Sequence, residues 1–476
     1  MAPNSTNLSK LDISNARISD TIPDWFWGLS PSSVILNISH NRISGVLPDL
    51  TFKFPDIRGI DLSYNNFEGT IPPVAPGVIY LILSNNKFSG SIASLLCGIT
   101  GEFFQYLDLS DNQLSGSLPN CSIRWQRLSV LDLANNNFSG KIPNSVDSGC
   151  SIKSLHLSNN IMDVGHNKFS GKIPAWIGDS LSDLVVLSLR SNQFRGMLPI
   201  PLCNLSTFQV LDLSLNNVAG AIPKCLANLT SMSQKESSDD ATNILYVSYR
   251  EQTLYKDYAQ LVWKGVDSLY KNTLGLVKSI DLSNNRLFGE IPEAITSLVG
   301  LISLNLSTNA LTGPIPPKLG QFSSLNSLDL SKNQLTGEIP ESFSELHSLG
   351  VLDLSNNRLS GKIPTSTKLQ SFDAPAYMGN PQLCGSPLQN KCPEKEPVHE
   401  SPTIPVHDDK EGFAFEGLCV SIFLGFFTGF WGVCGTLMLN RSWRTTYFKF
   451  LGDMKDRIYV FMAVNKANLQ RQLGSC

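Results

Sequence analysis

The amino-acid sequence predicts an α/β-type repeat solenoid followed by one transmembrane helix. The first observation is a recurring pattern, LxLSxNxLSGxIP, whose aligned Asn residues are often 24 positions apart, as from Asn309 to Asn333 to Asn357. The second is composition, because the 476 residues include 35 Gly and 27 Pro and only 16% are charged. The third is the stretch 417–439, which contains no charged residue. Self-similarity at a period of this length is typical of solenoids, in which each repeat packs on its neighbours.

The last complete repeat, residues 349–364, shows how the pattern predicts one coil. Leucines at alternate positions of a short strand should point into the core, and stacked strands should form a parallel sheet on the concave side. Asn357 is expected to pair its amide with backbone groups where the chain turns inward. Gly361 permits a tight turn and Pro364 needs no donor, so the convex side should be irregular or 3₁₀. The inward leucines of this repeat are Leu349, Leu352 and Leu354.

The LSGxIP half of the pattern resembles the plant-type leucine-rich repeat, and the resemblance covers residues 11–364. It implies the corresponding superhelix. Two interruptions break the period. Asn160 and Asn167 are only seven positions apart, so about one coil is expected to be missing there. Asn216 and Asn285 are 69 positions apart, which predicts an inserted island.

The island and the segments after the repeats complete the predicted organisation. The island begins where the pattern gives way to a polar stretch and then to a Tyr-rich one. The predicted division is a first repeat block at 1–223, the island at 224–274, four further repeats at 275–364, a C-terminal cap at 365–392, an acidic linker at 393–416, the transmembrane helix at 417–439 and a cytosolic tail at 440–476.

The uncharged stretch is long enough to cross a hydrocarbon core of about 30 Å as one helix. The linker before it carries seven acidic and two basic side chains, whereas the tail after it carries seven basic and two acidic ones. Basic residues stay in the cytosol, so we predict a single-pass type I protein of the plasma membrane with its N-terminal side outside. Gly425 and Gly429 form a GxxxG pair that can pack on a second helix, although glycine is common in such spans.

Six of the ten cysteines form three candidate pairs. Cys97 with Cys121, and Cys203 with Cys225, lie on successive coils, which are close enough for disulfide bonds. The null alternative, reduced core cysteines, stays open. N-x-S/T sequons favour a glycosylated ectodomain. They occur at Asn4, Asn7, Asn37, Asn120, Asn137, Asn204, Asn228 and Asn305. A further pair, Cys384 and Cys392, resembles the C-terminal cap of plant leucine-rich-repeat ectodomains, and the remaining Cys150 is expected to be buried.

The assembly of repeats, island, paired-Cys cap, acidic linker, single span and short basic tail resembles plant leucine-rich-repeat receptor-like proteins over nearly the whole chain. Within the island, Tyr255 followed after eight residues by Lys264 and Gly265 resembles the Yx8KG motif of that family, with Trp263 beside it. The resemblance implies that these four residues contact a co-receptor.

The two ends of the chain carry further expectations. The tail resembles that of receptors for fungal ethylene-inducing xylanase, and Tyr447 to Phe450, YFKF, fits a tyrosine-based endocytic pattern. Residues 1–14 contain no apolar signal core or N-terminal cap, so the sequence is expected to be truncated at its front end relative to that family.

Composition and motifs indicate binding without chemistry. The net charge of -3 and pI near 6.1 disfavour a nucleic-acid partner. No convergent set of titrating groups predicts an enzyme, and we expect neither a cofactor nor a metal site. The resemblance implies an extracellular protein or peptide ligand, a receptor-kinase adaptor and a co-receptor kinase. Three alternatives remain: a developmental receptor-like protein in meristem or stomatal peptide signalling, a secreted polygalacturonase-inhibitor-like binder, and a non-functional receptor fragment.

The ligand surface is expected on the concave sheet, where outward positions are usually Asp or Ser. Departures from these residue types are the candidate contacts, although neutral drift is an equally good account of any one of them. The candidates are His40, Tyr64, Ile82, His156 and Arg190.

Overall fold

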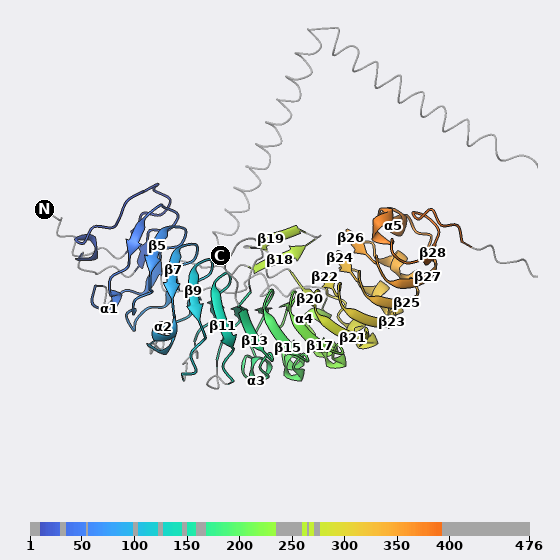
Figure 1. Ribbon diagram of the computed structural model, residues 1–476, viewed down its shortest axis with the longest axis horizontal. Helices are drawn as coiled ribbons and strands as arrows, with labels where there is room; N and C mark the ends of the chain where they lie inside the picture. The colour runs from blue at the N-terminus through green and yellow to red at the C-terminus, as the bar shows by residue number, and fades with distance from the viewer. Residues whose placement is uncertain are drawn as a thin grey trace, which may run out of the picture. The chain divides into compact units, whose positions relative to one another are not determined.

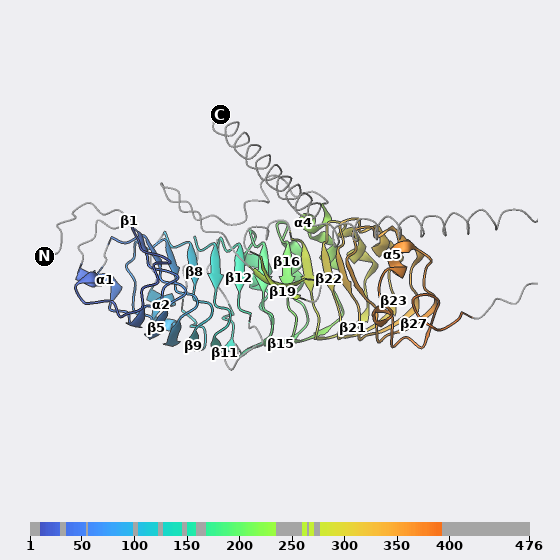
Figure 2. The same ribbon diagram turned by 90° about the horizontal axis from the view of Figure 1, so that it is seen from above.

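The computed structural model describes residues 10–28, 35–53, 56–98, 103–121, 127–144, 150–158, 168–234, 259–263, 266–270 and 277–392. Within the unit Met1–Glu394, successive repeats stack into a solenoid whose coils pass through two parallel sheets. Figure 1 follows the stacking from the blue N-terminal repeats to the orange C-terminal ones. Figure 2 shows strands of one sheet, such as β8 (Tyr106–Asp108), and strands of the other, such as β9 (Gln113–Gly116), along opposite sides. The predicted repeat solenoid is confirmed.

The first sheet is 13-stranded and parallel, and its strand order follows the chain. Its strands are three residues long and pair with their middle residues in register, as Leu328 does with Leu352. These middle residues are apolar and buried from Leu36 onward, so each coil adds a layer to one continuous core. We call the outward surface of this sheet the first-sheet face. The strands are β1 (Lys10–Asp12), β2 (Ile35–Asn37), β4 (Gly59–Asp61), β6 (Tyr80–Ile82), β8, β10 (Val130–Asp132), β12 (Ser154–His156), β14 (Val186–Ser188), β16 (Val210–Asp212), β20 (Ser279–Asp281), β22 (Ser303–Asn305), β24 (Ser327–Asp329) and β26 (Val351–Asp353).

The LSGxIP segments form a second 13-stranded parallel sheet, where the sequence led us to expect an irregular connection. In each segment the residue two positions before the glycine is buried, as Leu359 is before Gly361 in β27. The glycine has a positive φ, 81° at Gly361, which suits glycine, but Gly361 lies within β27 and not in the tight turn that the sequence predicts. The strands are β3 (Ser44–Val46), β5 (Asn66–Gly69), β7 (Lys87–Gly90), β9, β11 (Asn137–Lys141), β13 (Lys168–Gly171), β15 (Gln193–Gly196), β17 (Asn217–Gly220), β21 (Arg286–Glu290), β23 (Ala310–Pro314), β25 (Gln334–Glu338), β27 (Arg358–Lys362) and β28 (Gln382–Cys384).

Short helical turns return the chain from the second sheet to the first. Half of those named below are 3₁₀ turns that begin directly after the Pro of the repeat pattern, because proline fixes φ and needs no donor there. The predicted irregular or 3₁₀ connection is therefore confirmed for this part of the coil. The turns and short helices are η1 (Phe26–Gly28), α1 (Leu50–Lys53), α2 (Ala93–Gly98), α3 (Trp176–Ser180), η2 (Ile200–Asn204), η3 (Lys224–Asn228), α4 (Thr230–Ser233), η6 (Glu293–Ser297), η7 (Pro317–Gln321) and η8 (Glu341–Glu345).

The repeated Asn forms a hydrogen-bonded ladder between coils. The Nδ2 atom of Asn357 donates to the carbonyl oxygens of Leu330, Leu354 and Ser355 at 3.0, 3.1 and 3.2 Å. Its Oδ1 atom accepts from the backbone N–H of Leu335 at 3.1 Å. One side chain thus satisfies backbone groups of two neighbouring coils that the buried turn would leave unpaired, as the sequence predicts.

The C-terminal cap continues this ladder with a different sequence. Asn380 donates to the carbonyl oxygen of Leu354 and accepts from the N–H of Leu359, both at 3.0 Å, so it takes the role of the next repeat Asn. The buried Tyr377 hydroxyl donates to the carbonyl oxygen of Leu369 at 2.7 Å. The cap therefore pairs backbone hydrogen-bonding groups that the last coil would otherwise leave without partners. Its elements are α5 (Thr367–Gln370), η9 (Ala374–Ala376) and β28.

The solenoid runs without a break across the island. Strands β16 and β20 pair in register, and β17 pairs with β21, as if the intervening residues were absent. Asn285 donates to the carbonyl oxygen of Leu213 at 2.9 Å and accepts from the N–H of Val218 at 2.9 Å. The insertion therefore leaves the coil contacts unchanged.

The island begins later than the predicted residue 224. Strand β17 is followed by η3 and α4, whose apolar side chains belong to the main core, so the repeat block extends through about residue 234. The predicted boundary was too early because the stretch after Pro223 no longer matches the repeat pattern, although the spacing of its apolar residues still suits a coil. The buried side chains are Leu226, Leu229 and Met232.

No gap in either sheet marks the predicted loss of a coil near Asn160 and Asn167, which are themselves outside the described residues. Strand β12 pairs with β10 and β14, and β13 pairs with β11 and β15. The two half-patterns that look like separate repeat starts therefore belong to the two halves of one coil with a longer connection. A solenoid that had lost a coil would also form continuous sheets, so the expectation of a missing coil stays a prediction.

The later part of the island forms an antiparallel hairpin of β18 (Ala259–Trp263) and β19 (Val266–Tyr270). Its register ends with Trp263 paired to Val266. In the part of the chain that the structure describes, no helix is both long and apolar enough to cross a membrane, and the predicted span at 417–439 lies outside that part.

Candidate functional site

The common Asp and Ser residues of the first-sheet face satisfy one another. In the last coil, Asp353 Oδ1 accepts from the backbone N–H of Ser355 at 2.9 Å. In an earlier coil, Asp61 Oδ1 accepts from both the N–H and the hydroxyl of Ser63, at 3.0 and 2.7 Å. These pairs fix the chain as it leaves each strand. Coils with other residues at these positions are therefore the candidates for a dedicated function.

An apolar cluster occupies the first-sheet face between β2 and β10 and is separate from the main core. The Tyr80 ring lies over Gly59 of the preceding strand, where a Cβ atom would lie 2.0 Å from Tyr80 Cζ. Only glycine accommodates the ring there. The cluster consists of Ile79, Tyr80, Ile82, Tyr106 and Val130, with the half-buried Ile35 beside it.

Among the predicted contacts, two lie on this face but are buried. Ile82 belongs to the apolar cluster and is 7% exposed. His156 is 3% exposed, and its Nε2 lies 2.7 Å from the hydroxyl of Ser154. We expected outward strand positions to be open, but neighbouring side chains and turns cover short strands only about 4.8 Å apart.

The other three predicted contacts lie beyond the strand ends. Arg190 follows β14 and is half-buried. His40 and Tyr64 occupy the turn before the repeat Asn, at φ values of 55° and 54°, so they lie at the edge of the sheet instead of on a strand. The five candidates therefore divide between the centre of the face and its edge.

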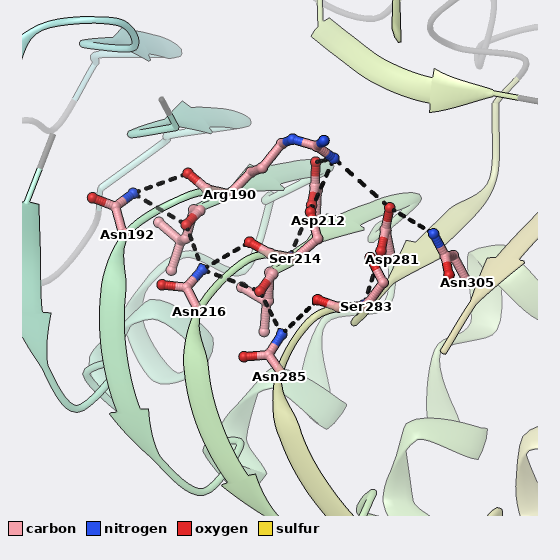
Figure 3. A network of polar contacts seen from close by, with 11 residues as sticks. Arg190, Asn192, Asp212, Ser214, Asn216, Asp281, Ser283, Asn285 and Asn305 are labelled. Atoms are coloured by element: carbon pink, nitrogen blue, oxygen red, sulfur yellow. Dashed lines mark hydrogen bonds and ion pairs between the residues drawn. The ribbon is translucent and has the colours of Figure 1, made fainter. Parts of the chain in front are cut away.

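Arg190 is the centre of a polar network that spans three coils (Figure 3). Its Nη1 donates to the Ser214 hydroxyl at 3.0 Å and lies 3.8 Å from Asp212 Oδ2 and 3.9 Å from Asp281 Oδ2. Asn305 donates to Asp281 at 3.3 Å. One guanidinium is thus shared by two nearly buried carboxylates on strands that are separated in sequence by the island.

Burial and, after it, the neighbouring Asp212 carboxylate raise the pKa of Asp281, which is about 7. The hydrogen bonds from Ser283 and the charge of Arg190 act in the opposite direction. Two carboxylates beside one cation cannot both ionise freely in a desolvated site. Among the described residues, no group of three His, Cys, Asp or Glu side chains is arranged to hold a metal ion.

A shallow groove of about 600 Å³ runs along the edge of the first sheet at the N-terminal coils. The rings of His40 and Tyr64 are stacked, with centroids 4.3 Å apart and planes 11° apart. Beyond Tyr64, the same repeat position is occupied by Asn85 and then Asp111, which are hydrogen-bonded at 3.4 Å. All of the lining residues are polar or aromatic. They are Asn15, His40, Asn41, Tyr64, Asn65, Asn66, Asn85, Asn86, Lys87 and Asp111.

The cysteine pairs lie where the sequence predicts disulfides. Bonds join Cys97 to Cys121, Cys203 to Cys225, and Cys384 to Cys392, while Cys150 is buried and unbonded to another cysteine.

Two of the predicted glycosylation sites lie on the first-sheet face, Asn37 in β2 and Asn305 in β22. Asn137 lies in the second sheet, Asn204 and Asn228 end 3₁₀ turns, and Asn120 follows β9. Asn4 and Asn7 are outside the described residues. The described sequons thus lie on several sides of the solenoid, and the two on the first-sheet face are far apart in coil order.

Of the predicted co-receptor residues, only Trp263 falls within the described residues, at the end of β18. Tyr255, Lys264 and Gly265 lie outside them. The helix-packing pair Gly425 and Gly429 and the endocytic residues Tyr447 and Phe450 also lie outside the described residues.

Sequence reasoning missed four members of the apolar cluster, Ile79 and the three strand residues Tyr80, Tyr106 and Val130. They precede the inward leucine of their strands, whereas we compared residues only after it. The available signal was that the corresponding positions in the C-terminal coils are Ser279, Ser303 and Ser327.

Comparison with known families identifies the repeats. Two models, described as "Leucine rich repeat" and "Leucine Rich Repeat", match the chain in separate segments. The first covers residues 6–67 and 315–359, and the second covers 77–99, 103–123, 127–148, 183–205, 276–298 and 300–322.

Two tomato (Solanum lycopersicum) proteins are similar over nearly the whole chain. Receptor-like protein EIX2 is 49% identical over 98% of this chain, and Receptor-like protein EIX1 is 44% identical over 99%. Each alignment covers 48% of the tomato protein. The chain thus spans about half the length of the curated relatives it matches.

Solved plant receptor ectodomains share the fold. The Arabidopsis receptor kinase HAESA, in complex with an N-terminally extended IDA peptide hormone, is 27% identical with a TM-score of 0.54 over 82% of this chain and 64% of HAESA. The plant peptide hormone receptor RGFR1, in complex with RGF2, is 24% identical with a TM-score of 0.50 over 73% of this chain and 55% of RGFR1. The second likeness concerns the fold alone.

Proposed function

The chain belongs to the plant leucine-rich-repeat receptor-like proteins, and on this premise we propose that it forms part of a cell-surface receptor for an extracellular protein or peptide. In this proposal the first-sheet face binds the ligand, one helix at 417–439 anchors the chain in the plasma membrane, and partner receptor kinases carry the signal inside. The chain itself performs no catalysis. We further propose that the ligand is microbial and that the receptor acts in defence.

The observation that carries the proposal is the position of the unusual residues on the first-sheet face. They are concentrated between β6 and β14, whereas β20, β22 and β24 present mainly Ser and Asp with the single Asn305. Large aromatic side chains and Arg are the residue types that dominate binding energy in protein interfaces. A scaffold needs only the inward leucines and the Asn ladder, so the fold does not require Tyr80, Tyr106 or Arg190 at these positions.

The two sequons on this face are consistent with a binding surface between them. Asn37 lies in β2 and Asn305 in β22, so glycans on both would leave the strands from β4 to β20 uncovered by attached sugar. A glycan is bulky and hydrated, and it blocks close contact where it is attached. This arrangement favours a ligand on the apolar cluster and the Arg190 network.

The relatives favour an extracellular ligand of protein type. HAESA is solved with a peptide hormone ligand, and it shares the solenoid at a TM-score of 0.54. The two tomato relatives are receptor-like proteins. These likenesses support a peptide or protein ligand over a small metabolite, but its identity rests on experiment.

The test measures binding of a purified fungal ethylene-inducing xylanase to the full chain by surface plasmon resonance. Tyr106→Ser introduces the residue that β22 and β24 carry at the same position, so it preserves the repeat pattern. Tyr106 is 3% exposed, so the substitution removes packing that shapes the face instead of a direct contact, and we expect a loss of at least about tenfold in affinity. Substituting His40, Tyr64, Ile82, His156 and Arg190 together by Ala should also abolish the response.

The matched control is Ser327→Ala at the same strand position of β24. It should leave the affinity unchanged, because that coil lies outside the proposed surface. Equal losses for Tyr106→Ser and Ser327→Ala would contradict a localised ligand site. Full binding by the fivefold Ala variant would place the ligand elsewhere.

Partner kinases are the second part of the proposal. By resemblance, the island motif of Tyr255, Lys264 and Gly265, with Trp263, recruits a co-receptor kinase, and an adaptor kinase associates through the span, where Gly425 and Gly429 are available for helix packing. Substituting Tyr255, Lys264 and Gly265 should abolish co-precipitation with the co-receptor kinase while leaving expression and membrane insertion unchanged. Unchanged recruitment would reduce the island to a structural insertion.

A developmental role is the alternative, because a receptor for an endogenous signalling peptide could use the same modules. The peptide-hormone complex of HAESA favours this class of ligand. Binding of plant signalling peptides but of no microbial protein would decide for it. In either role, internalisation through Tyr447 and Phe450 is expected to be lost on Tyr447→Ala.

A further inference from the structure

We propose that the groove at the edge of the first sheet, beside His40 and Tyr64, binds a neutral oligosaccharide. This site lies beyond the strand ends and shares His40 and Tyr64 with the fivefold Ala variant, but it can be correct whether or not the strands bind a protein, because Tyr106→Ser tests that surface without changing the groove. The inference combines two stacked aromatic rings, the chemistry of the groove lining and the regular repetition of equivalent positions along the solenoid.

The backbone at His40 and Tyr64 is in the left-handed region, with φ of 55° and 54°. The equivalent positions of other coils share this conformation, and they are Asn in five cases and Asp111, Ser191, Leu215, Thr308 and Lys332 in the rest. For a bulky residue such as Tyr it is unfavourable. Because Leu215 and Thr308 adopt the same conformation in other coils, the repeat imposes it, and it serves here to place the two rings at the edge of the sheet. The equivalent Asn residues include Asn15, Asn85, Asn135, Asn284 and Asn356.

The groove lining suits hydroxyl groups better than apolar side chains. Its ten residues include six Asn and no aliphatic side chain. The amides of Asn41, Asn65 and Asn86 are already bonded in the ladder, so the other three Asn are the ones offered to a ligand. An amide donates and accepts at once, as a sugar hydroxyl does, so the two are matched partners. Asn15 and Asn66 form no side-chain hydrogen bond with another described residue, which leaves their amides available. The single ammonium of Lys87 and the single carboxylate of Asp111 give the groove no net charge, so it does not select an ionic ligand.

The aromatic pair supplies the apolar half of sugar recognition. The stack uses one face of each ring, and Tyr64 retains 40% of its surface exposed. The equivalent residue of the next coil is the shorter Asn85, so the second face of the Tyr64 ring borders the groove, with Asp111 beyond it. The C–H face of a pyranose packs on such a ring while its equatorial hydroxyls reach the surrounding amides. The residues repeat along the solenoid axis, which favours an extended chain of sugars.

The experiment uses isothermal titration calorimetry of the purified, deglycosylated full chain with cellohexaose and chitohexaose, and with hexagalacturonate as an anionic comparison. Removing the chain's own glycans keeps a sugar on Asn37 from filling the groove. We expect at least one neutral hexasaccharide to bind at millimolar or lower concentration. In the double variant His40→Asn with Tyr64→Asn, the affinity should fall at least about tenfold.

The same double variant should unfold at an equal or higher urea concentration than the parent, because Asn suits the positive φ. Lost binding with retained stability therefore supports the site and separates it from a structural role. If the variant is also less stable, Tyr64→Phe decides: it keeps the ring, so retained binding supports the proposal and lost binding overturns it.

Lys332→Asn is the matched control, since Lys332 is the residue equivalent to Tyr64 in a C-terminal coil, and its substitution should leave binding unchanged. Three results would overturn the proposal. They are no heat with either neutral hexasaccharide, binding of hexagalacturonate alone, and binding by the double variant equal to that of the parent.

Discussion

The first-sheet face has two contrasting stretches on one scaffold. From β6 to β10 it presents the aromatic and aliphatic side chains of the apolar cluster. From β20 to β26 it presents Ser at most positions before the inward leucine, and Asp or Asn after it. The Asn ladder is the same in both stretches, with Asn136 and Asn333 each bonded to three carbonyl oxygens and one N–H.

This contrast separates what the fold needs from what it leaves free. The inward leucines and the ladder are constant because each coil would otherwise leave buried backbone groups unpaired. The outward positions vary because the solenoid tolerates both Tyr106 and Ser327 at one strand position. Variation confined to one stretch is therefore a better indicator of function than variation spread over the whole molecule.

The largest effect is expected from removing a ladder Asn in either stretch. Asn136→Ala and Asn333→Ala should each lower the free energy of unfolding by about 3–4 kcal/mol, since each leaves buried backbone groups without partners. Urea unfolding followed by circular dichroism measures this loss. Equal losses would show that the two stretches share one scaffold.

The controls for the ladder variants are Gln113→Ala and Gln334→Ala, on the outward side of the second sheet. They should change the free energy of unfolding little. A loss of stability confined to Asn136→Ala would mean that the C-terminal coils do not depend on the ladder. The two stretches would then not share one scaffold.

The second effect concerns a covalent difference between the stretches. Residues 277–363 contain no Cys, whereas Cys97 and Cys121 close a 24-residue separation in the N-terminal coils. The double variant Cys97→Ser with Cys121→Ser should lose about 3 kcal/mol, because the bond restricts the unfolded chain. The measurement is urea unfolding without reductant. With reductant, which opens the other two disulfides in both proteins, parent and variant should be equally stable. Equal stability of the two proteins without reductant as well would contradict a structural disulfide.

The third effect lies at the junction of the two stretches, where Arg190 reaches Asp281. The ordinary pKa of Asp281 is 3.8, and burial raises it to about 7. The native chain therefore keeps this proton as pH rises, while the unfolded chain loses it, so the stabilising contribution is lost as pH rises through about 7. Between pH 5 and 7 we expect a fall on the order of 2–3 kcal/mol from this group.

The difference between the parent and Asp281→Asn isolates this contribution, since other carboxylates titrate in both proteins. Urea unfolding at pH 5, 6 and 7 should show a smaller decline in the variant. Arg190→Gln removes the charge that lowers the pKa of Asp281, so its decline should be steeper than that of the parent. Parallel curves for all three proteins would show that Asp281 is ionised throughout.

The repeat pattern predicts the first sheet and the ladder well because both are local to one coil. The second sheet was not predicted, since Gly and Pro in LSGxIP favour a turn when one repeat is considered alone, and pairing occurs only between coils. The start of the island was placed too early because Leu226, Leu229 and Met232 keep an apolar spacing without the repeat letters. The hairpin β18 and β19 depends on contacts within the island that no repeat describes.

The candidate site was predicted only in part. Sequence comparison between coils finds unusual residues such as Ile82 and Arg190, but it does not show what covers them. Burial of His156 beside Ser154 and the stacking of His40 on Tyr64 depend on neighbouring coils, so one repeat cannot reveal them. The network around Arg190 joins residues on both sides of the island, and only the continuity of the first sheet brings Asp281 to Asp212.

The smallest effect is expected at an exposed ion pair of the C-terminal stretch. Lys318 Nζ lies 2.8 Å from Glu293 Oε1, but the two side chains are 59% and 66% exposed. The hydrogen bond from Lys318 lowers the pKa of Glu293, yet water and salt screen such a pair, and ordering two long side chains offsets the attraction. Glu293→Gln should therefore give no measurable change in the urea midpoint at low or high salt, whereas Arg190→Gln should lower it, because that substitution leaves two nearly buried carboxylates without their cation. A midpoint for Glu293→Gln that falls at low salt and recovers at high salt would show that surface charge contributes to the C-terminal coils.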